Sequence, residues 1–417
     1  MTIQSVKSIF STTPGHDEVV DAVRAIAVLA TIIFHIFAGF LKVWDTSFTH
    51  DFLSGMGWWI APLFQAEKGV DAFFLLSGLV LGLPLFQKLN SFNVIQAKTF
   101  YWRRFTRIYP LFLVALLFYH FLRKGDFNSE FFSNLFFINN FSKKWDPIIP
   151  VGWSLTIEVQ LYLLVPFYFF LIKRVNRPQW IMGITILLSF FITAWTLISY
   201  PELINRPISD LLLASDRDHF GAVYGKNIYE TFANRFAPFV IGLWLAYLKV
   251  NYSKHLERLM GNKIWGNFLI LTGFFLVGVV IFMPVYDLEG WYVKNFSPQI
   301  HFLYQVFSRQ FFSMGLAIVM LAAWHGRGVG AFLRLIAQWP FWAPFSKLAY
   351  PLYLFHYPCI VISALLVFRS TDLKVLQSVN LVQAFMVFVL SCVISVCLSI
   401  PLHFYIEKKF MNYKRSS

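Results

Sequence analysis

Charged residues and cysteines are both scarce in this sequence. Charged residues make up 13% of the 417 residues, whereas hydrophobic residues make up 58%. A water-soluble fold could not cover that much apolar surface, so this class of protein is excluded. The three cysteines, Cys359, Cys392 and Cys397, all lie in apolar runs, which argues against an extracellular disulfide framework and a cysteine-rich metal site. The composition therefore predicts an integral membrane protein.

Acidic residues are few as well, since 21 Asp and Glu stand against 35 Lys and Arg, for a net charge of +14. The basic residues occur in short clusters between apolar runs, without a basic domain or tail, so we expect no nucleic-acid partner. They follow the positive-inside rule when the N-terminus is placed in the cytoplasm. No small-residue cleavage pattern follows Phe40, so we expect the first apolar run to be a retained helix.

Apolar runs recur along the chain, and a helical span needs about 20 such residues. They predict an all-α, polytopic membrane protein with about ten transmembrane helices and both termini in the cytoplasm. We expect a cytoplasmic N-terminal segment (1–20), a transmembrane domain (21–410) and a cytoplasmic tail (411–417). The expected spans are 24–41, 70–86, 107–122, 154–172, 180–200, 233–248, 265–283, 304–324, 348–368 and 380–406.

Two ionisable residues of the first expected span lie on one helix face. Arg24 and His35 are eleven positions apart in DAVRAIAVLATIIFH, which at about 100° per residue brings them to the same face, about 16 Å apart along the axis. A polar group inside a bilayer is costly, so function is the default hypothesis for His35. The alternative is a structural hydrogen bond between helices.

A carboxylate lies near the start of the fourth expected span. Ser154, Glu158 and Tyr162 recur every four positions in GWSLTIEVQLYLLVP and therefore share a face. A buried Glu158 would be neutral unless it were paired, and His35 is a candidate partner within hydrogen-bond reach, directly or through one water. The alternative is a glutamate that caps the start of the helix.

Polar residues also occur in two other apolar segments. Tyr353 and His356 are three positions apart in AYPLYLFHYP, so both can face one cavity, where His356 is a candidate for orienting a catalytic group or binding an acceptor. Helix packing is the alternative. Asp71, in GVDAFFLLSG, is expected at the outer entrance of its span, and the small pair Ser77 and Gly78 is expected to allow close helix packing.

A basic cluster precedes the third expected span. Arg103, Arg104 and Arg107 lie in FYWRRFTRIYP at the expected cytoplasmic face. Most such clusters are topogenic anchors. Arg104 and Arg107, three positions apart, could also clamp phosphate groups through charge-assisted hydrogen bonds.

These segments together resemble the acyltransferase 3 family of membrane-bound acyltransferases, whose members include O-antigen and exopolysaccharide acetylases. A basic residue, ten intervening residues and a histidine match Arg24 and His35, and an arginine pair with two residues between matches Arg104 and Arg107. The Trp-Ser-Leu-x-x-Glu signature matches residues 153–158. The segments occur in the family's order and are DAVRAIAVLATIIFH, GVDAFFLLSGLVL, FYWRRFTRIYPLF, GWSLTIEVQLYLLVPF and YPLYLFHYP.

The resemblance implies an enzyme of the bacterial inner membrane that moves an acyl group, most often acetyl, from acyl-CoA to a hydroxyl of a cell-envelope or exported polysaccharide. It implies no permanently bound cofactor or metal, and envelope-polysaccharide assembly proteins are candidate partners. The resemblance implies that His35 acts either as a general base on the acceptor hydroxyl or through an acyl-imidazole intermediate. The resemblance and the residue patterns together give the predicted sites. They are His35, Glu158 and Arg24 for catalysis, Arg103, Arg104 and Arg107 for the donor, and Asp71, Ser154, Tyr353 and His356 for the cavity or acceptor.

Two other functions fit the sequence less well. A transporter or flippase of a glycan or small solute would also have about ten spans and buried ionisable residues. A noncatalytic assembly subunit would explain the spans but would leave the buried charges without a purpose.

Overall fold

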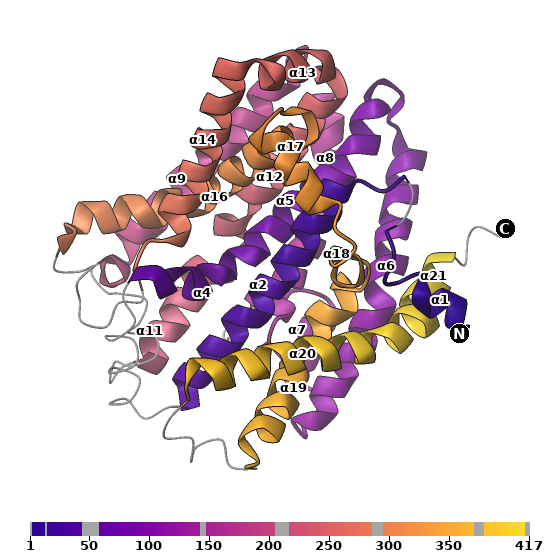
Figure 1. Cartoon of the computed structure of the whole chain (residues 1–417), viewed down its shortest axis with the longest axis vertical. Helices are drawn as coiled ribbons and strands as arrows, with labels where there is room; N and C mark the ends of the chain where they lie inside the picture. Colours follow the sequence, from indigo (N-terminus) through magenta and orange to yellow (C-terminus); the bar gives the residue numbers. More distant parts are fainter. Residues whose placement is uncertain are drawn as a thin grey trace.

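The computed structural model describes residues 2–12, 15–43, 58–141, 147–204, 217–285, 295–370 and 379–412. Within these ranges all regular secondary structure is helical (Figure 1). The longer helices are α2 (Glu18–Val43), α5 (Lys68–Gln87), α6 (Val94–Leu122), α8 (Gly152–Ile172), α9 (Pro178–Ser199), α12 (Phe232–Asn251), α14 (Lys263–Ile281), α16 (Pro298–His325), α19 (Ala349–Phe368) and α20 (Leu381–Leu402). The shorter helices are α1 (Ile3–Lys7), α4 (Ala61–Phe64), α7 (Ser129–Leu135), α11 (Arg217–Tyr224), α13 (Ser253–Gly261), α17 (Val329–Ala337), α18 (Trp342–Lys347) and α21 (Lys408–Asn412).

Nine helical segments in the described ranges are long and apolar enough to cross a membrane, which confirms the prediction of an all-α polytopic membrane protein. Their lipid-facing sides are recognisable from large exposed hydrophobic side chains, such as Leu271 and Phe275 on α14 and Phe191 on α9. The nine segments are Glu18–Gly39, Ala61–Gln87, Val94–Leu122, Gly152–Ile172, Pro178–Ser199, Lys263–Ile281, Pro298–His325, Ala349–Phe368 and Leu381–Met411. The cytoplasmic location of the termini stays a prediction.

One of the ten expected spans, 233–248, is not among these nine segments. It forms α12, which is 20 residues long. Its polar residues Asn234, Arg235 and Lys249 lower its hydropathy. No residue from Phe232 to Val250 is exposed, because neighbouring helices surround α12. A helix in the middle of a bundle can keep polar residues that find partners among the helices around it.

Helices α5 and α12 approach each other closely where two glycines face the opposite backbone. A Cβ atom built on Gly78 would lie 2.0 Å from the carbonyl oxygen of Phe239, and one on Gly242 would lie 2.0 Å from that of Leu75. Any larger residue would therefore push the two helices apart. The expectation of close packing at Gly78 is confirmed, with Gly242 as its counterpart.

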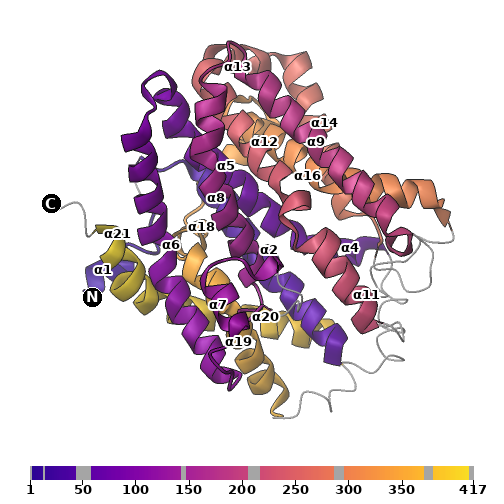
Figure 2. The same ribbon diagram turned by 180° about the vertical axis from the view of Figure 1, so that it is seen from behind.

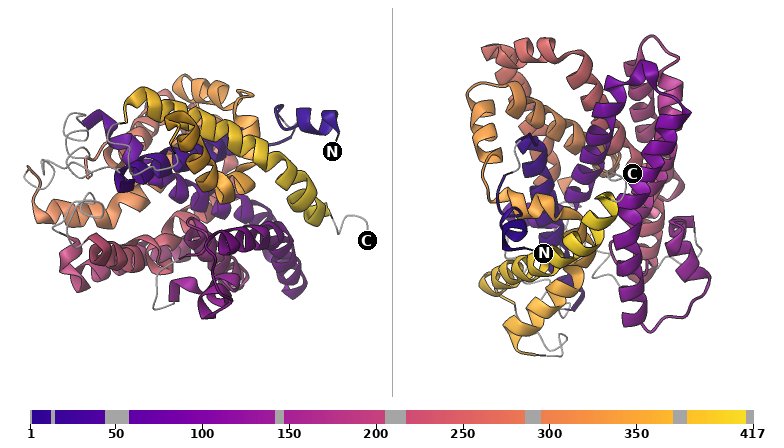
Figure 3. Two further views of the ribbon diagram at one scale, coloured as in Figure 1. Left: turned by 90° about the horizontal axis from the view of Figure 1, so that it is seen from below. Right: turned by 90° about the vertical axis from the view of Figure 1, so that its right-hand side faces the viewer.

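Helices α2, α5, α6, α8 and α19 meet in one region of the bundle. Helix α2 packs against α5 on one side and against α19 and α20 on another, and α20 crosses over α2 and α19 (Figures 1 and 3). Helices α6 and α8 run next to each other on the opposite side of the molecule (Figure 2). All ten predicted site residues lie on these five helices.

Candidate active site

A cavity of about 130 Å³ lies between α2, α5, α6, α8 and α19. Its wall is mainly apolar, with Phe73 and Phe74 of α5 and Leu155 of α8 among the lining residues. Six of the ten predicted site residues line this one cavity although they come from four different helices. They are Arg24, Arg104, Arg107, Ser154, Glu158 and Tyr353.

The carboxylate of Glu158 accepts hydrogen bonds from two hydroxyl groups in the cavity. One comes from Ser77 of α5 and the other from Tyr162, one turn further along α8. The two hydroxyl oxygens are themselves 3.1 Å apart. Ser77 was predicted from the sequence to serve helix packing only. The structure shows that its hydroxyl is also a partner of the glutamate.

The direct hydrogen bond expected between Glu158 and His35 does not form in the described part of the chain, where the hydrogen bonds of Glu158 go to Ser77 and Tyr162. The expectation rested on depth along two separate helices. Spacing within a helix sets which residues share a face, but it does not set how that helix is rotated against a neighbour.

His35 instead lies against His356. Nε2 of His356 is 3.1 Å from Nδ1 of His35, and the ring centroids are 4.9 Å apart. Nδ1 of His35 is also 2.8 Å from the carbonyl oxygen of Thr31, one helical turn earlier. On the other side, Nδ1 of His356 is 2.8 Å from the carbonyl oxygen of Tyr353. The two imidazoles thus form a chain between backbone carbonyls of α2 and α19.

Tyr353 connects this histidine pair to the cavity. Its hydroxyl is 2.5 Å from Oγ of Ser154, on the cavity wall. Its ring centroid is 6.0 Å from that of His356 and 5.6 Å from that of Phe73. His35 and His356 therefore lie next to the cavity, behind Tyr353, rather than in its lining.

Hydrogen bonds to side chains of α2 and α18 hold Arg24 at the edge of the cavity. Nη1 of Arg24 donates to Oδ1 of Asp21 at 3.0 Å and to Oγ of Ser346 at 3.2 Å, and Ser346 donates to the same Asp21 oxygen at 2.7 Å. Asp21 was not among the residues predicted from the sequence. Its position three residues before Arg24, on the same helix face, was the available signal.

The cavity is electropositive. Its lining contains three guanidinium groups, from Arg24, Arg104 and Arg107, and one carboxylate, from Glu158. Asp21 offsets part of the charge of Arg24 from outside the lining. Such a set of planar donors suits an anionic ligand, phosphate above all. Arg103 is exposed and lies outside the lining, which favours its reading as a topogenic anchor.

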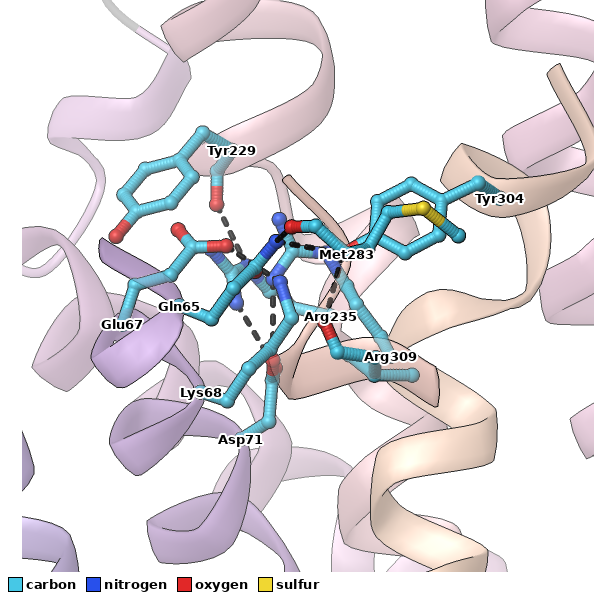
Figure 4. A network of polar contacts seen from close by, with 10 residues as sticks. Gln65, Glu67, Lys68, Asp71, Tyr229, Arg235, Met283, Tyr304 and Arg309 are labelled. Carbon is cyan, nitrogen blue, oxygen red and sulfur yellow. Dashed lines mark hydrogen bonds and ion pairs between the residues drawn. The ribbon is translucent and has the colours of Figure 1, made fainter. Parts of the chain in front are cut away.

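Asp71 belongs to a separate buried ion cluster. Nη1 of Arg235 lies 2.8 Å from one carboxylate oxygen and Nη1 of Arg309 lies 3.1 Å from the other (Figure 4). Glu67 and Lys68 form a second pair beside it, at 2.5 Å. Asp71 is fully buried and is not in the cavity lining. The structure therefore does not place this candidate with the other six.

The two arginines of this cluster were not among the residues predicted from the sequence. Arg235 lies inside α12, where its guanidinium covers the rings of Trp153 and Tyr229 at 4.9 and 4.5 Å from their centroids. Arg309 lies in the interior of α16. A basic residue inside an apolar run was a signal for each, since such residues normally face a partner within the bundle.

The fold and the cavity define a multi-pass membrane protein with an interior cationic site next to paired histidines. Residues 17–404 match the family model described as an acyltransferase domain, and the chain belongs to this family. The predictions of an acyltransferase and of the family are thereby confirmed. No solved structure matches the chain.

Curated relatives are distant and mostly longer. The peptidoglycan O-acetyltransferase OatA of Listeria monocytogenes is 30% identical over 200 residues, which cover 43% of this chain and 29% of that protein. The O-acetyltransferase OatA of Staphylococcus aureus is 24% identical over 359 residues, or 82% of this chain and 50% of that protein. The nose resistant to fluoxetine protein 6 of Caenorhabditis elegans is 22% identical over 331 residues, or 70% of this chain and 38% of that protein. The chain thus spans half or less of these three proteins.

Proposed function

We propose that this protein transfers an acyl group, in the first place acetyl, from acyl-CoA to a hydroxyl of a cell-envelope or exported polysaccharide. The observation that carries the proposal is the cavity that gathers Arg24, Arg104, Arg107 and Glu158 next to His35 and His356. The names of two relatives, both O-acetyltransferases, support a hydroxyl acceptor. We place the protein in the cytoplasmic membrane of a bacterium, where the donor enters from the cytoplasmic side.

The arginines fit the donor because acyl-CoA carries several phosphate groups. A guanidinium keeps its charge at any physiological pH and offers paired donors that match phosphate oxygens. Arg24 and Arg107 come from different helices and line the same cavity, so a phosphate between them would be held from two sides. Arg103 is exposed and lies outside the cavity lining, so we do not propose that it contacts the reacting end of the donor.

The histidine pair supports a defined tautomer for His35. If Nδ1 of His356 donates its proton to the carbonyl of Tyr353, its Nε2 carries a lone pair and accepts a hydrogen bond from Nδ1–H of His35. The lone pair of His35 is then on Nε2. This is the form that a general base or a nucleophile requires.

Two routes of transfer are compatible with that tautomer. As a base, Nε2 of His35 takes the proton of the acceptor hydroxyl while the hydroxyl oxygen bonds to the thioester carbonyl carbon. The C–S bond then breaks. The sulfur leaves as thiolate and takes up the proton that His35 received. As a nucleophile, Nε2 bonds to the carbonyl carbon first, and the C–S bond breaks so that the sulfur leaves as thiolate. The acceptor oxygen then bonds to the same carbon while the C–N bond to the imidazole breaks, and the thiolate takes up the proton of the acceptor hydroxyl.

Glu158 has a different role in this proposal from the one that sequence analysis gave it. Its carboxylate accepts from Ser77 and Tyr162, and Arg104 lies over the Tyr162 ring at 5.9 Å from the centroid. We infer that Glu158 orders the arginine-lined wall and balances its charge when no donor is bound. Tyr353 and Ser154, between the cavity and the histidines, are the groups that an acceptor would meet.

The test is acyl transfer by the protein in lipid nanodiscs, with radiolabelled acetyl-CoA and envelope polysaccharide. The wild type is expected to label the polysaccharide, whereas the H35A variant should not. The matched control is H255A, because His255 is exposed on α13, away from the cavity. Labelling by H35A at the wild-type rate would overturn the proposal, and uptake of an unmodified solute into vesicles would favour a transporter.

A further inference from the structure

A second cavity lies on the other side of the Asp21–Arg24 pair. Its volume is about 120 Å³, similar to that of the first. It is formed where the segment before α2 meets the segment 337–347 around α18. Its lining residues are Thr12, Gly15, His16, Glu18, Asp21, Ala337, Trp339, Trp342, Ala343 and Lys347.

The two cavities share one boundary. Asp21 lines the second cavity and Arg24, on the next turn of α2, lines the first. The two side chains bond to each other at 3.0 Å, and Ser346 bonds to both. A ligand that extends past this boundary would have one end at the arginines of the first cavity and the other end in the second.

The second cavity offers an aromatic corner. The Trp339 and Trp342 rings are nearly perpendicular, at 86°, with centroids 6.3 Å apart. Trp342 is fixed by a hydrogen bond of 2.7 Å from its Nε1 to the carbonyl oxygen of Ile336. Trp339 is 61% exposed. A flat heterocycle can stack on such an exposed ring while its edge meets the second ring.

The polar groups of this cavity suit a nucleoside. The carboxylates of Glu18 and Asp21 accept hydrogen bonds, as the hydroxyl groups of a ribose and the amino group of a base require. Lys347, whose ammonium group is held by the carbonyl oxygens of Ser8 and Ser11 at 2.7 and 2.6 Å, adds a fixed positive charge. The groups therefore combine base stacking, ribose acceptors and a cation next to the arginine cavity.

We propose that the second cavity binds the adenosine end of the acyl-CoA donor. The adenine ring stacks on Trp339, the phosphate on the ribose lies toward Lys347, the diphosphate lies at the boundary toward Arg24 and Arg107, and the pantetheine arm continues into the first cavity. This inference rests on the proposed function for the identity of the donor. It adds a recognition site for the nucleotide that is separate from the reacting centre.

The experiment compares acetyl-CoA with acetyl-pantetheine, which has the thioester but no nucleotide. The variants are W339A and W339F, and the matched control is W180A, because Trp180 on α9 is 62% exposed and lies outside the second cavity. We expect W339A to raise KM for acetyl-CoA roughly tenfold, as the loss of one base–aromatic stack would. KM for acetyl-pantetheine and kcat for both donors should stay unchanged, W339F should restore most of the affinity, and W180A should behave as the wild type.

An unchanged KM for acetyl-CoA in W339A, or an equal rise for both donors, would overturn the nucleotide site. A second readout does not depend on catalysis: equilibrium dialysis of the nanodisc-embedded protein with radiolabelled adenosine bisphosphate, the nucleotide end of CoA alone. Weaker binding by W339A than by W180A is expected, and equal binding would again contradict the site. Absence of transfer from either donor by the wild type would count against the proposed function, whereas the dialysis result would still decide the nucleotide site.

Discussion

Nε2 of His356 lies 3.1 Å from Nδ1 of His35, so a histidine of α19 contacts the histidine on which acyl transfer is proposed to depend. Because His356 also bonds to the backbone of Tyr353, its orientation is fixed by its own helix. We interpret His356 as a positioning residue that sets the tautomer and the direction of the His35 ring.

Replacing His356 with phenylalanine should separate positioning from chemistry. An aromatic ring is kept, but Nδ1–H of His35 loses its acceptor on α19 and is left with the carbonyl oxygen of Thr31 on its own helix, so the ring is no longer oriented from the neighbouring helix. We expect kcat to fall by about 100-fold while KM for acetyl-CoA stays the same. The measurement is steady-state kinetics in nanodiscs over a range of pH. H356Q, which keeps an acceptor, should recover part of kcat. Wild-type kcat in H356F would contradict the positioning role.

The hydroxyl groups on Glu158 give a second prediction. S77A removes one donor to a carboxylate, and a hydrogen bond to a charged group contributes about 1.5–3 kcal/mol. We expect lower thermal stability and weaker donor binding, since the wall that includes Arg104 loses its order. E158Q keeps the shape but removes the charge and should impair transfer more than S77A does. Thermal unfolding and donor titration of both variants check this order.

The control for this pair is S91A, because Ser91 is exposed and bonds only locally, to the carbonyl oxygen of Lys88. It should leave both stability and donor binding unchanged. If S77A also behaved as the wild type, the hydroxyl would not be a significant partner of Glu158.

Much of this arrangement was predictable from sequence, but only within single helices. The spacing of Ser154, Glu158 and Tyr162 places them on one face, and the structure shows all three on the cavity wall, each in contact with a residue of another helix. The partner of His35 was not predictable, because it depends on how α2, α8 and α19 are rotated against one another. A bond such as that from Ser77 to Glu158 joins residues 81 positions apart, and nothing local in either segment specifies it.

The segment that precedes α2 gives a prediction about pH. Asp17 is partly buried, which alone would raise its pKa, but hydrogen bonds from Lys249 and Trp324, both at 2.8 Å, outweigh burial and lower the pKa below 3.8. A carboxyl group with a lowered pKa in the folded state stabilises the fold above its unfolded pKa, and this contribution is lost as the pH falls through the folded pKa.

The D17N variant should therefore unfold at a lower temperature than the wild type at neutral pH. The difference should begin to shrink below about pH 4, where the wild-type carboxyl group becomes protonated in the unfolded state, and it should be lost as the pH falls through the lower pKa of the folded state. Thermal unfolding of both proteins between neutral and acidic pH measures it. A difference that stays constant through the acidic range would show that the charge of Asp17 is not the cause.

The close contact of α5 and α12 predicts a sharp contrast between two glycines. G78A places a Cβ 2.0 Å from the carbonyl oxygen of Phe239, a distance that the backbone cannot accept without moving. The helices must separate, so we expect clear destabilisation and loss of transfer, because Ser77 moves with Gly78. In G278A, on α14, the new Cβ meets nothing within 4 Å, and alanine favours a helix over glycine by about 1 kcal/mol. That variant should be as stable as the wild type or more stable, and a similar loss in both variants would contradict the packing explanation.

The ion cluster around Asp71 provides the last prediction. Asp71 holds two guanidinium groups at 2.8 and 3.1 Å, and both Asp71 and Arg235 are fully buried. D71N keeps the shape but leaves both arginines without their shared counter-charge, and breaking a buried ion pair from one side typically costs about 3–5 kcal/mol. Arg235 also covers the ring of Trp153, which lies next to Ser154 at the start of α8, so the change should reach the cavity. We expect D71N to unfold at a lower temperature than the wild type and to bind donor less well. The double variant D71N/R309M, which removes one of the two uncompensated charges as well, should recover part of the stability; if it were less stable than D71N alone, charge imbalance would not be the reason for the loss.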